Sequence, residues 1–90
     1  MIKLSEIFEP LNQINWRDQA AHAAVGYIIT TLVSAAVNPL WALSISALVA
    51  VIREQTQHFG ECHAGCRTDL AFWIAGSIVG VVAVAALAAL

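Results

Sequence analysis

The sequence predicts an all-α, polytopic membrane protein with three transmembrane helices preceded by a short amphipathic interfacial helix. Of its 90 residues, 60% are hydrophobic and 11% are charged, whereas a typical soluble domain carries about 25% charged residues. Nearly all charges lie in two segments, 3–18 and 53–69, with long apolar runs between and after them. So short a chain has too little polar surface to cover this apolar fraction in water. We therefore interpret residues 1–90 as a single membrane domain.

Residues 2–14 form the first predicted element. Their apolar and charged side chains fall on opposite faces at helical spacing, up to the interruption at Pro10. The apolar positions are Leu4, Ile7, Phe8 and Leu11. This pattern predicts a short helix lying in the membrane interface. A partly ordered tail is the alternative, because so short a helix is marginal in water.

The first transmembrane helix is predicted over residues 18–37. Asn15 is placed to cap its N-terminus, with Asp18 as the reciprocal partner three residues later. The apolar part, 20–37, spans roughly 27 Å at 1.5 Å per residue, which nearly matches a hydrocarbon core of ~30 Å. The Asn38-Pro39 pair ends this helix, since the residue before a proline avoids helical dihedrals.

The second and third helices are predicted over residues 39–58 and 69–90. The apolar part of the second ends at Ile52 and spans roughly 21 Å, so we extend this helix with a polar segment into the headgroup region. A cytoplasmic loop, 59–68, follows. Thr68 or Asp69 caps the third helix, whose roughly 31 Å is a full span.

Three spans place the N-terminus and the 53–69 loop on one side of the membrane. The cations, all on that side, are Lys3, Arg17, Arg53 and Arg67. The positive-inside rule then predicts a bacterial inner-membrane protein with its N-terminus in and its C-terminus out. Trp16 and Trp73 would mark the inner interface and Trp41 the outer one. A cleaved signal peptide is not expected, because the first apolar run starts after Asp18.

Polar residues from all three helices converge at this membrane face. Asp18 and His22 share one helix face, and Glu54 and Gln57 share another. The predicted cluster is Asp18, His22, Arg53, Glu54, Gln57, Arg67 and Asp69. Ionisable groups at membrane depth are costly and are usually paired or functional, although capping alone also explains Asp18 and Asp69. Arg53 and Glu54 are sequence neighbours that point apart on a helix, so they are not expected to neutralise each other.

Small residues predict close helix packing, and two cysteines raise the question of a metal. Gly26 and the Gly76-x-x-x-Gly80 motif suit close approach in lipid, within the protomer or in an oligomer. The metal candidates in the loop are His58, Cys62, His63 and Cys66. Their spacing is not a standard zinc pattern, and cytosolic thiols stay free, so neither a metal nor any other cofactor is predicted. A disulfide is the alternative, and it gains weight if the topology is inverted.

The order of these motifs resembles that of VanZ-like membrane proteins. The residues that carry the resemblance are Asp18-x-x-x-His22, Arg53-Glu54-x-x-Gln57, Arg67-x-Asp69 and Gly76-x-x-x-Gly80. The resemblance covers roughly residues 16–80 and implies a cell-envelope or glycopeptide-resistance role, with no settled chemistry. The chain departs from the family near Trp73, where the family tends to have Asn, and it is shorter than most members.

These observations support three hypotheses. The first is a VanZ-like envelope protein whose polar cluster binds a lipid headgroup or a membrane-protein partner; acid–base work by His22 and Glu54 is an option, but no catalytic residue is assigned. The second is a holin-type pore former that oligomerises through the small-residue face of its third helix. The third is an accessory subunit of a larger membrane complex. With a net charge of −2 and no Lys/Arg run, nucleic acid is not an expected partner.

Overall fold

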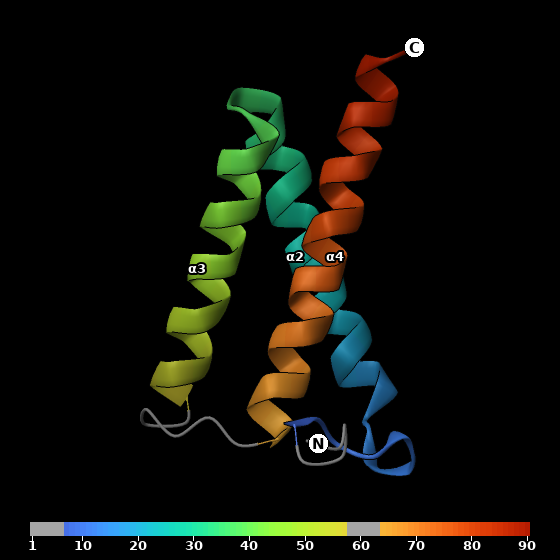
Figure 1. The fold of residues 1–90 in the computed structure, drawn as a ribbon, viewed down its shortest axis with the longest axis vertical. Coiled ribbons are helices and arrows are strands. Elements are labelled where there is room, and N and C mark those ends of the chain that lie inside the picture. The colour runs from blue at the N-terminus through green and yellow to red at the C-terminus, as the bar shows by residue number, and fades with distance from the viewer. Residues whose placement is uncertain (1–6, 58–63) are drawn as a thin grey trace.

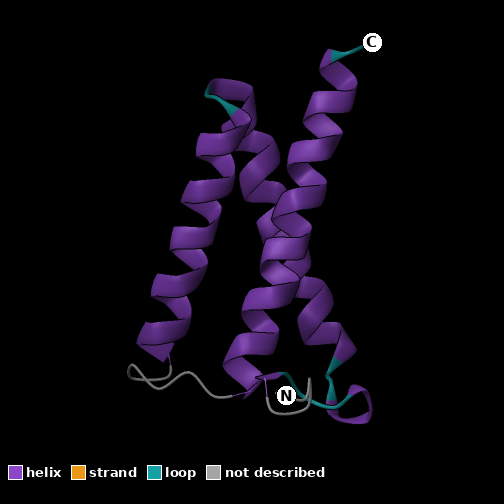
Figure 2. Ribbon diagram, in the orientation of Figure 1, coloured by secondary structure: helices purple, strands orange, loops and turns teal. Residues whose placement is uncertain are grey.

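The computed structural model describes residues 7–57 and 64–90, and all regular structure in these ranges is helical (Figure 2). The elements are a 3-10 turn η1 (Leu11–Gln13), then α2 (Trp16–Ala36), α3 (Pro39–Gln57) and α4 (Ala64–Ala88). The predicted all-α class is confirmed, and the three long helices match the number expected from the apolar runs.

The three helices lie side by side with alternating directions (Figure 1). The start of α2, the end of α3 and the start of α4 share one end of the bundle, which we call the polar end. The α2–α3 turn and the C-terminus lie at the opposite end. The interface between α2 and α4 is the most extensive of the three. The described charged residues of both segments are thereby brought to one end.

Local chemistry sets the boundaries of α2 and α3. The Asn15 side chain accepts a hydrogen bond from the Asp18 backbone N–H at 3.3 Å, as an N-cap does. At the other end, Asn38 Oδ1 accepts from the Leu40 N–H at 2.8 Å. Pro39 takes the first position of α3, where its missing N–H costs nothing and its fixed φ suits the helix.

The prediction for the start of the third helix was wrong. Residues 64–68 were expected to belong to a loop, with Thr68 or Asp69 as a cap, but α4 begins at Ala64. The Thr68 hydroxyl donates to the Ala64 carbonyl at 2.8 Å inside the helix. Cys66 and Thr68 are buried against the rest of the bundle, and this packing outweighs the poor helix propensity of Gly65. Residues 58–63, including the predicted end of the second helix, lie outside the described residues.

The segment before α2 crosses the start of α4. The Glu9 backbone N–H donates to Thr68 Oγ1 at 2.9 Å, and Arg67 Nε donates to the Ile7 carbonyl at 2.7 Å. Of the interfacial helix predicted over 2–14, residues 2–6 lie outside the described residues. After Pro10 the chain forms the single turn η1 instead of continuing a helix, as the proline requires.

The bundle buries mostly polar or small side chains and exposes many large apolar ones. The buried hydrophobic residues are Ala42, Ala50, Cys66 and Trp73. The buried polar side chains are Gln19, Thr30, Ser46, Glu54, Thr68 and Ser77. The exposed side chains include many large apolar ones, among them Leu32, Leu40, Trp41, Leu48 and Val82. A soluble protein has the reverse arrangement. By length and composition, α4 is the one helix in the described ranges that could cross a membrane.

Glycines allow α4 to approach α2 closely. A Cβ atom on Gly76 would overlap the Ala23 backbone, and one on Gly26 would overlap the Trp73 carbonyl. A Cβ on Gly80 would overlap the Thr30 side chain. The three glycines that the sequence assigned to helix packing therefore all lie in the α2–α4 contact of a single chain.

Candidate functional site

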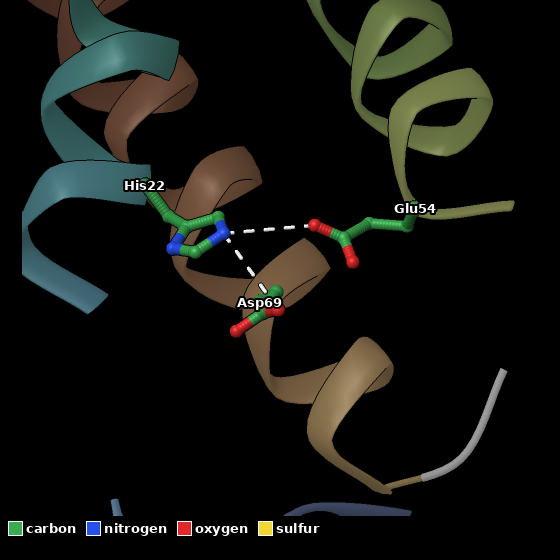
Figure 3. A group of neighbouring side chains, drawn as sticks. All are labelled: His22, Glu54 and Asp69. Carbon is green, nitrogen blue, oxygen red and sulfur yellow. Dashed lines mark ion pairs between the residues drawn. The ribbon is translucent and has the colours of Figure 1, made fainter. Parts of the chain in front are cut away.

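One side chain from each long helix meets at the polar end. His22 comes from α2, Glu54 from α3 and Asp69 from α4, and the three point toward one another (Figure 3). His22 Nε2 lies 3.6 Å from Glu54 Oε1 and 3.7 Å from Asp69 Oδ2. One ligand-capable atom from each residue falls within 4.8 Å of the others. We call these residues the His–Glu–Asp cluster.

A backbone hydrogen bond fixes the orientation of the imidazole. His22 Nδ1 lies 2.7 Å from the Asp18 carbonyl oxygen. A carbonyl oxygen can only accept, so Nδ1 carries a proton and donates it. The other nitrogen, Nε2, is thereby directed at the two carboxylates. Asp18 contributes its backbone carbonyl to the site, although the residue as a whole is exposed.

Glu54 is fully buried although it lies only one turn from the end of α3. Arg53 Nη1 donates to Glu54 Oε1 at 2.8 Å and lies 3.4 Å from His22 Nε2. The expectation that Arg53 and Glu54 would not pair was wrong, because the long arginine side chain reaches the carboxylate of the adjacent residue. Its guanidinium approaches the site from outside, since the Arg53 side chain remains 47% exposed.

Gln19 is a member of the site that the sequence did not reveal. Its Nε2 donates to Asp69 Oδ1 at 2.7 Å, which leaves Asp69 Oδ2 turned toward His22. The residue is 3% exposed, and its Oε1 atom is buried without a hydrogen-bond donor among the described residues. Gln19 precedes Gly26 by seven residues, two helical turns. This spacing places Gln19 on the same packed face of α2 as Gly26, and it is the sequence signal from which its burial could have been predicted.

A small groove opens beside the cluster. It measures about 160 Å³ and is lined by Ala21, His22, Val25, Arg53 and Trp73. Its basic side chains come from Arg53 and His22, and the rest of the lining is apolar or aromatic. A larger hollow of about 410 Å³ lies between the segment before α2 and the start of α4. That hollow is mainly apolar and includes no member of the cluster, so we place the chemistry at the smaller groove.

Trp73, which lines the groove, is held in a closed ring of hydrogen bonds with Ser46 and Ser77. Trp73 Nε1 donates to Ser46 Oγ at 3.1 Å, and Ser77 Oγ donates to the Trp73 carbonyl at 2.9 Å. Because the Ser77 proton is used there, Ser46 donates in the 2.7 Å contact between the two hydroxyls. Trp73 is 4% exposed, so its predicted place in an interfacial aromatic belt was wrong. Trp16 and Trp41 are exposed, as such a belt requires.

The other predicted site residues lie elsewhere. Gln57 is exposed at the end of α3, and Arg67 binds the Ile7 carbonyl. Cys66 is disulfide-bonded and buried, so the expected free thiol was wrong and no thiolate is available there for a metal. The remaining loop candidates, His58, Cys62 and His63, lie outside the described residues.

The arrangement suits two kinds of charged ligand. The imidazole nitrogen and two carboxylates converge on one point, where a cation would be favoured. The guanidinium at the groove favours an anion, because arginine matches the geometry of phosphate and carboxylate oxygens. No protein-family model, curated protein or solved structure matches the chain.

Proposed function

We propose that this is a small integral membrane protein whose three long helices span the bilayer and whose groove binds a phosphate-bearing lipid headgroup. The inverted distribution of polar and apolar side chains supports the three spans. The helices α2 and α3 have 21 and 19 residues, or roughly 31 and 28 Å, close to a hydrocarbon core of ~30 Å. The few charges of α2 and α3 lie at the polar end, where headgroups would begin.

The observation that carries the headgroup proposal is the position of Arg53. Its half-exposed guanidinium lines a groove together with His22, and the remaining walls are Ala21, Val25 and Trp73. An anionic phosphate would meet the guanidinium, and the apolar walls would face the start of the lipid tails. The volume of about 160 Å³ suits a headgroup phosphate and excludes a whole lipid.

The resemblance to VanZ-like proteins remains a hypothesis, to which the present proposal adds a headgroup as the ligand. It receives support from geometry, because residues of three separate motifs, His22, Glu54 and Asp69, meet at one place. The pore-former alternative depended on a free small-residue face of α4. Gly76 and Gly80 contact α2 within the chain, so we favour a headgroup-binding protein, alone or as a subunit of a membrane complex.

Headgroup binding is tested with the soluble lipid dihexanoyl phosphatidic acid and the purified protein in maltoside detergent. Calorimetry is expected to show saturable binding that Arg53→Gln weakens roughly 10- to 100-fold, as for the loss of a hydrogen bond between charged groups. Arg17→Gln is the matched control, because Arg17 is exposed at the same end and does not line the groove. Dihexanoylglycerol, which lacks the phosphate, should not bind. Equal binding by wild type and Arg53→Gln would contradict the proposal.

Orientation is a separate prediction. The cations favour a cytoplasmic polar end, while the disulfide at Cys66 is the kind of bond that persists in oxidising compartments. Because the Lys/Arg bias sets orientation, we expect alkaline phosphatase fused after Leu90 to be active outside the cytoplasm. If the fusion is inactive and the polar end is labelled from outside the cell, the orientation is the opposite of the one predicted. The disulfide would then lie in an oxidising compartment.

A further inference from the structure

We infer that the His–Glu–Asp cluster binds a divalent transition-metal ion such as Zn²⁺. The inference concerns the same end of the bundle as the headgroup groove, but it does not rest on the proposed headgroup function. One imidazole nitrogen and two carboxylates are ligands that Zn²⁺ accepts, and three protein ligands leave a coordination position open for water or another oxygen ligand.

The spacing of the ligand atoms fits a metal better than it fits direct contact. His22 Nε2 lies 3.6 Å from Glu54 Oε1 and 3.7 Å from Asp69 Oδ2, longer than the usual 2.7–3.2 Å of a hydrogen bond from nitrogen to oxygen. Tetrahedral ligands at 2.0–2.1 Å from zinc lie about 3.3 Å from one another. The two distances from His22 Nε2 would have to shorten by a few tenths of an ångström, and the Glu54 and Asp69 oxygens, which lie within 4.8 Å of each other, would have to approach as well.

The surroundings hold each ligand as metal sites do. The Nδ1–H of His22 donates to the Asp18 carbonyl, and metal-ligating histidines usually donate their second ring N–H in this way, which leaves Nε2 as the metal ligand. The Gln19 amide holds Asp69 through the oxygen that faces away from His22. The same amide carries a buried oxygen that lacks a donor among the described residues. His22 Nε2 and the two carboxylate oxygens can all serve as metal ligands, and a metal ion among them would offset the repulsion between the carboxylates.

Arg53 supplies a positive charge at the cluster in the absence of metal. Its Nη1 lies 2.8 Å from Glu54 Oε1 and 3.4 Å from His22 Nε2, and so contacts two of the three ligand atoms that a bound ion would need. Because the Arg53 side chain is half exposed, it can rotate outward when a metal enters. Metal and guanidinium therefore compete for the carboxylate, and removal of the arginine should favour the metal.

The test is zinc binding by the full chain in maltoside detergent without phospholipid, measured by equilibrium dialysis and calorimetry. We expect one Zn²⁺ per chain. His22→Ala and Asp69→Asn, which remove a metal ligand, should each weaken binding more than about 100-fold. Gln19→Leu, which removes only the residue that holds Asp69, should weaken it roughly 10- to 100-fold. Arg53→Gln should tighten zinc binding, although the same variant weakens the binding of phosphatidic acid.

Controls separate this site from the loop and from misfolding. Asp18→Asn removes a nearby carboxylate outside the cluster, and a His58→Ala/His63→Ala double variant removes the loop imidazoles; both should retain zinc. If His22→Ala loses its helical circular dichroism, the isosteric Asp69→Asn and Glu54→Gln variants decide. The inference would be overturned if the wild type bound no zinc. It would also be overturned if Asp69→Asn and Glu54→Gln still bound zinc while the His58→Ala/His63→Ala variant did not. Neither result would affect the phosphatidic acid experiment, which tests the headgroup proposal separately.

Discussion

Gly76→Ala is expected to destabilise the bundle, even though alanine is the better helix former. Helix propensity alone would stabilise the variant by about 0.8–1 kcal/mol. The added Cβ would overlap the Ala23 backbone, which cannot rotate away as a flexible side chain can. Overpacking typically costs about 1–3 kcal/mol, so the net sign should be destabilising. Gly76→Val adds two further methyl groups, so it should lower the stability more than Gly76→Ala and separate α2 from α4.

The measurement is unfolding of the detergent-solubilised protein by sodium dodecyl sulfate, followed by circular dichroism. Ala75→Val is the matched control, because Ala75 is the neighbouring residue on α4 and is exposed. It should change the midpoint little. A Gly76→Ala variant that is more stable than wild type would show that propensity dominates and that α4 does not contact α2 as described.

Arg53→Gln is expected to destabilise the protein much more than Glu54→Gln. The first variant leaves a buried carboxylate without its nearest guanidinium, and loss of one partner of a buried pair costs about 3–5 kcal/mol. The half-exposed position of Arg53 should bring the cost toward the lower end of this range. Glu54→Gln removes the buried charge itself, and its arginine partner can turn to water, so a cost under about 1.5 kcal/mol is expected.

A double-mutant cycle checks this asymmetry by the same unfolding measurement. Once Glu54 is neutral, removal of Arg53 should have little further effect, so the Arg53→Gln/Glu54→Gln variant should match Glu54→Gln alone. Additive losses would mean that the two side chains act independently. The stability of Arg53→Gln should also rise with added zinc, since a ligand that binds the folded state stabilises it by mass action.

Part of the candidate site could be predicted from the sequence. His22, Glu54 and Asp69 were identified because ionisable residues at the ends of apolar helices are rare and costly. The alternation of long apolar runs and short polar segments predicted that these three residues lie at the same end of the bundle. Gly26, Gly76 and Gly80 were identified as packing residues, because small residues allow helices to approach closely in lipid.

Other members of the site could not be predicted. Gln57 was expected to share a face with Glu54, yet it is exposed. The buried positions of α3 recur every four residues, at Ala42, Ser46, Ala50 and Glu54, and Gln57 does not fall in this series. Gln19 and Ser46 are ordinary polar residues in sequence; their roles arise from contacts with Asp69, Trp73 and Ser77 on another helix. Arg53 pairs with its own neighbour because its side chain is long enough to reach the Glu54 carboxylate.

The sequence by itself determined the helical class, the number of long helices and the collection of charges at one end, because these follow from local periodicity and from where polar residues interrupt apolar runs. The tertiary structure decided where α4 begins, which side of each helix is buried and which polar groups meet. These features depend on packing between residues distant in sequence, such as a glycine that contacts the backbone of another helix or a carboxylate that contacts an imidazole on another helix. Periodicity along a single helix carries no information about such contacts.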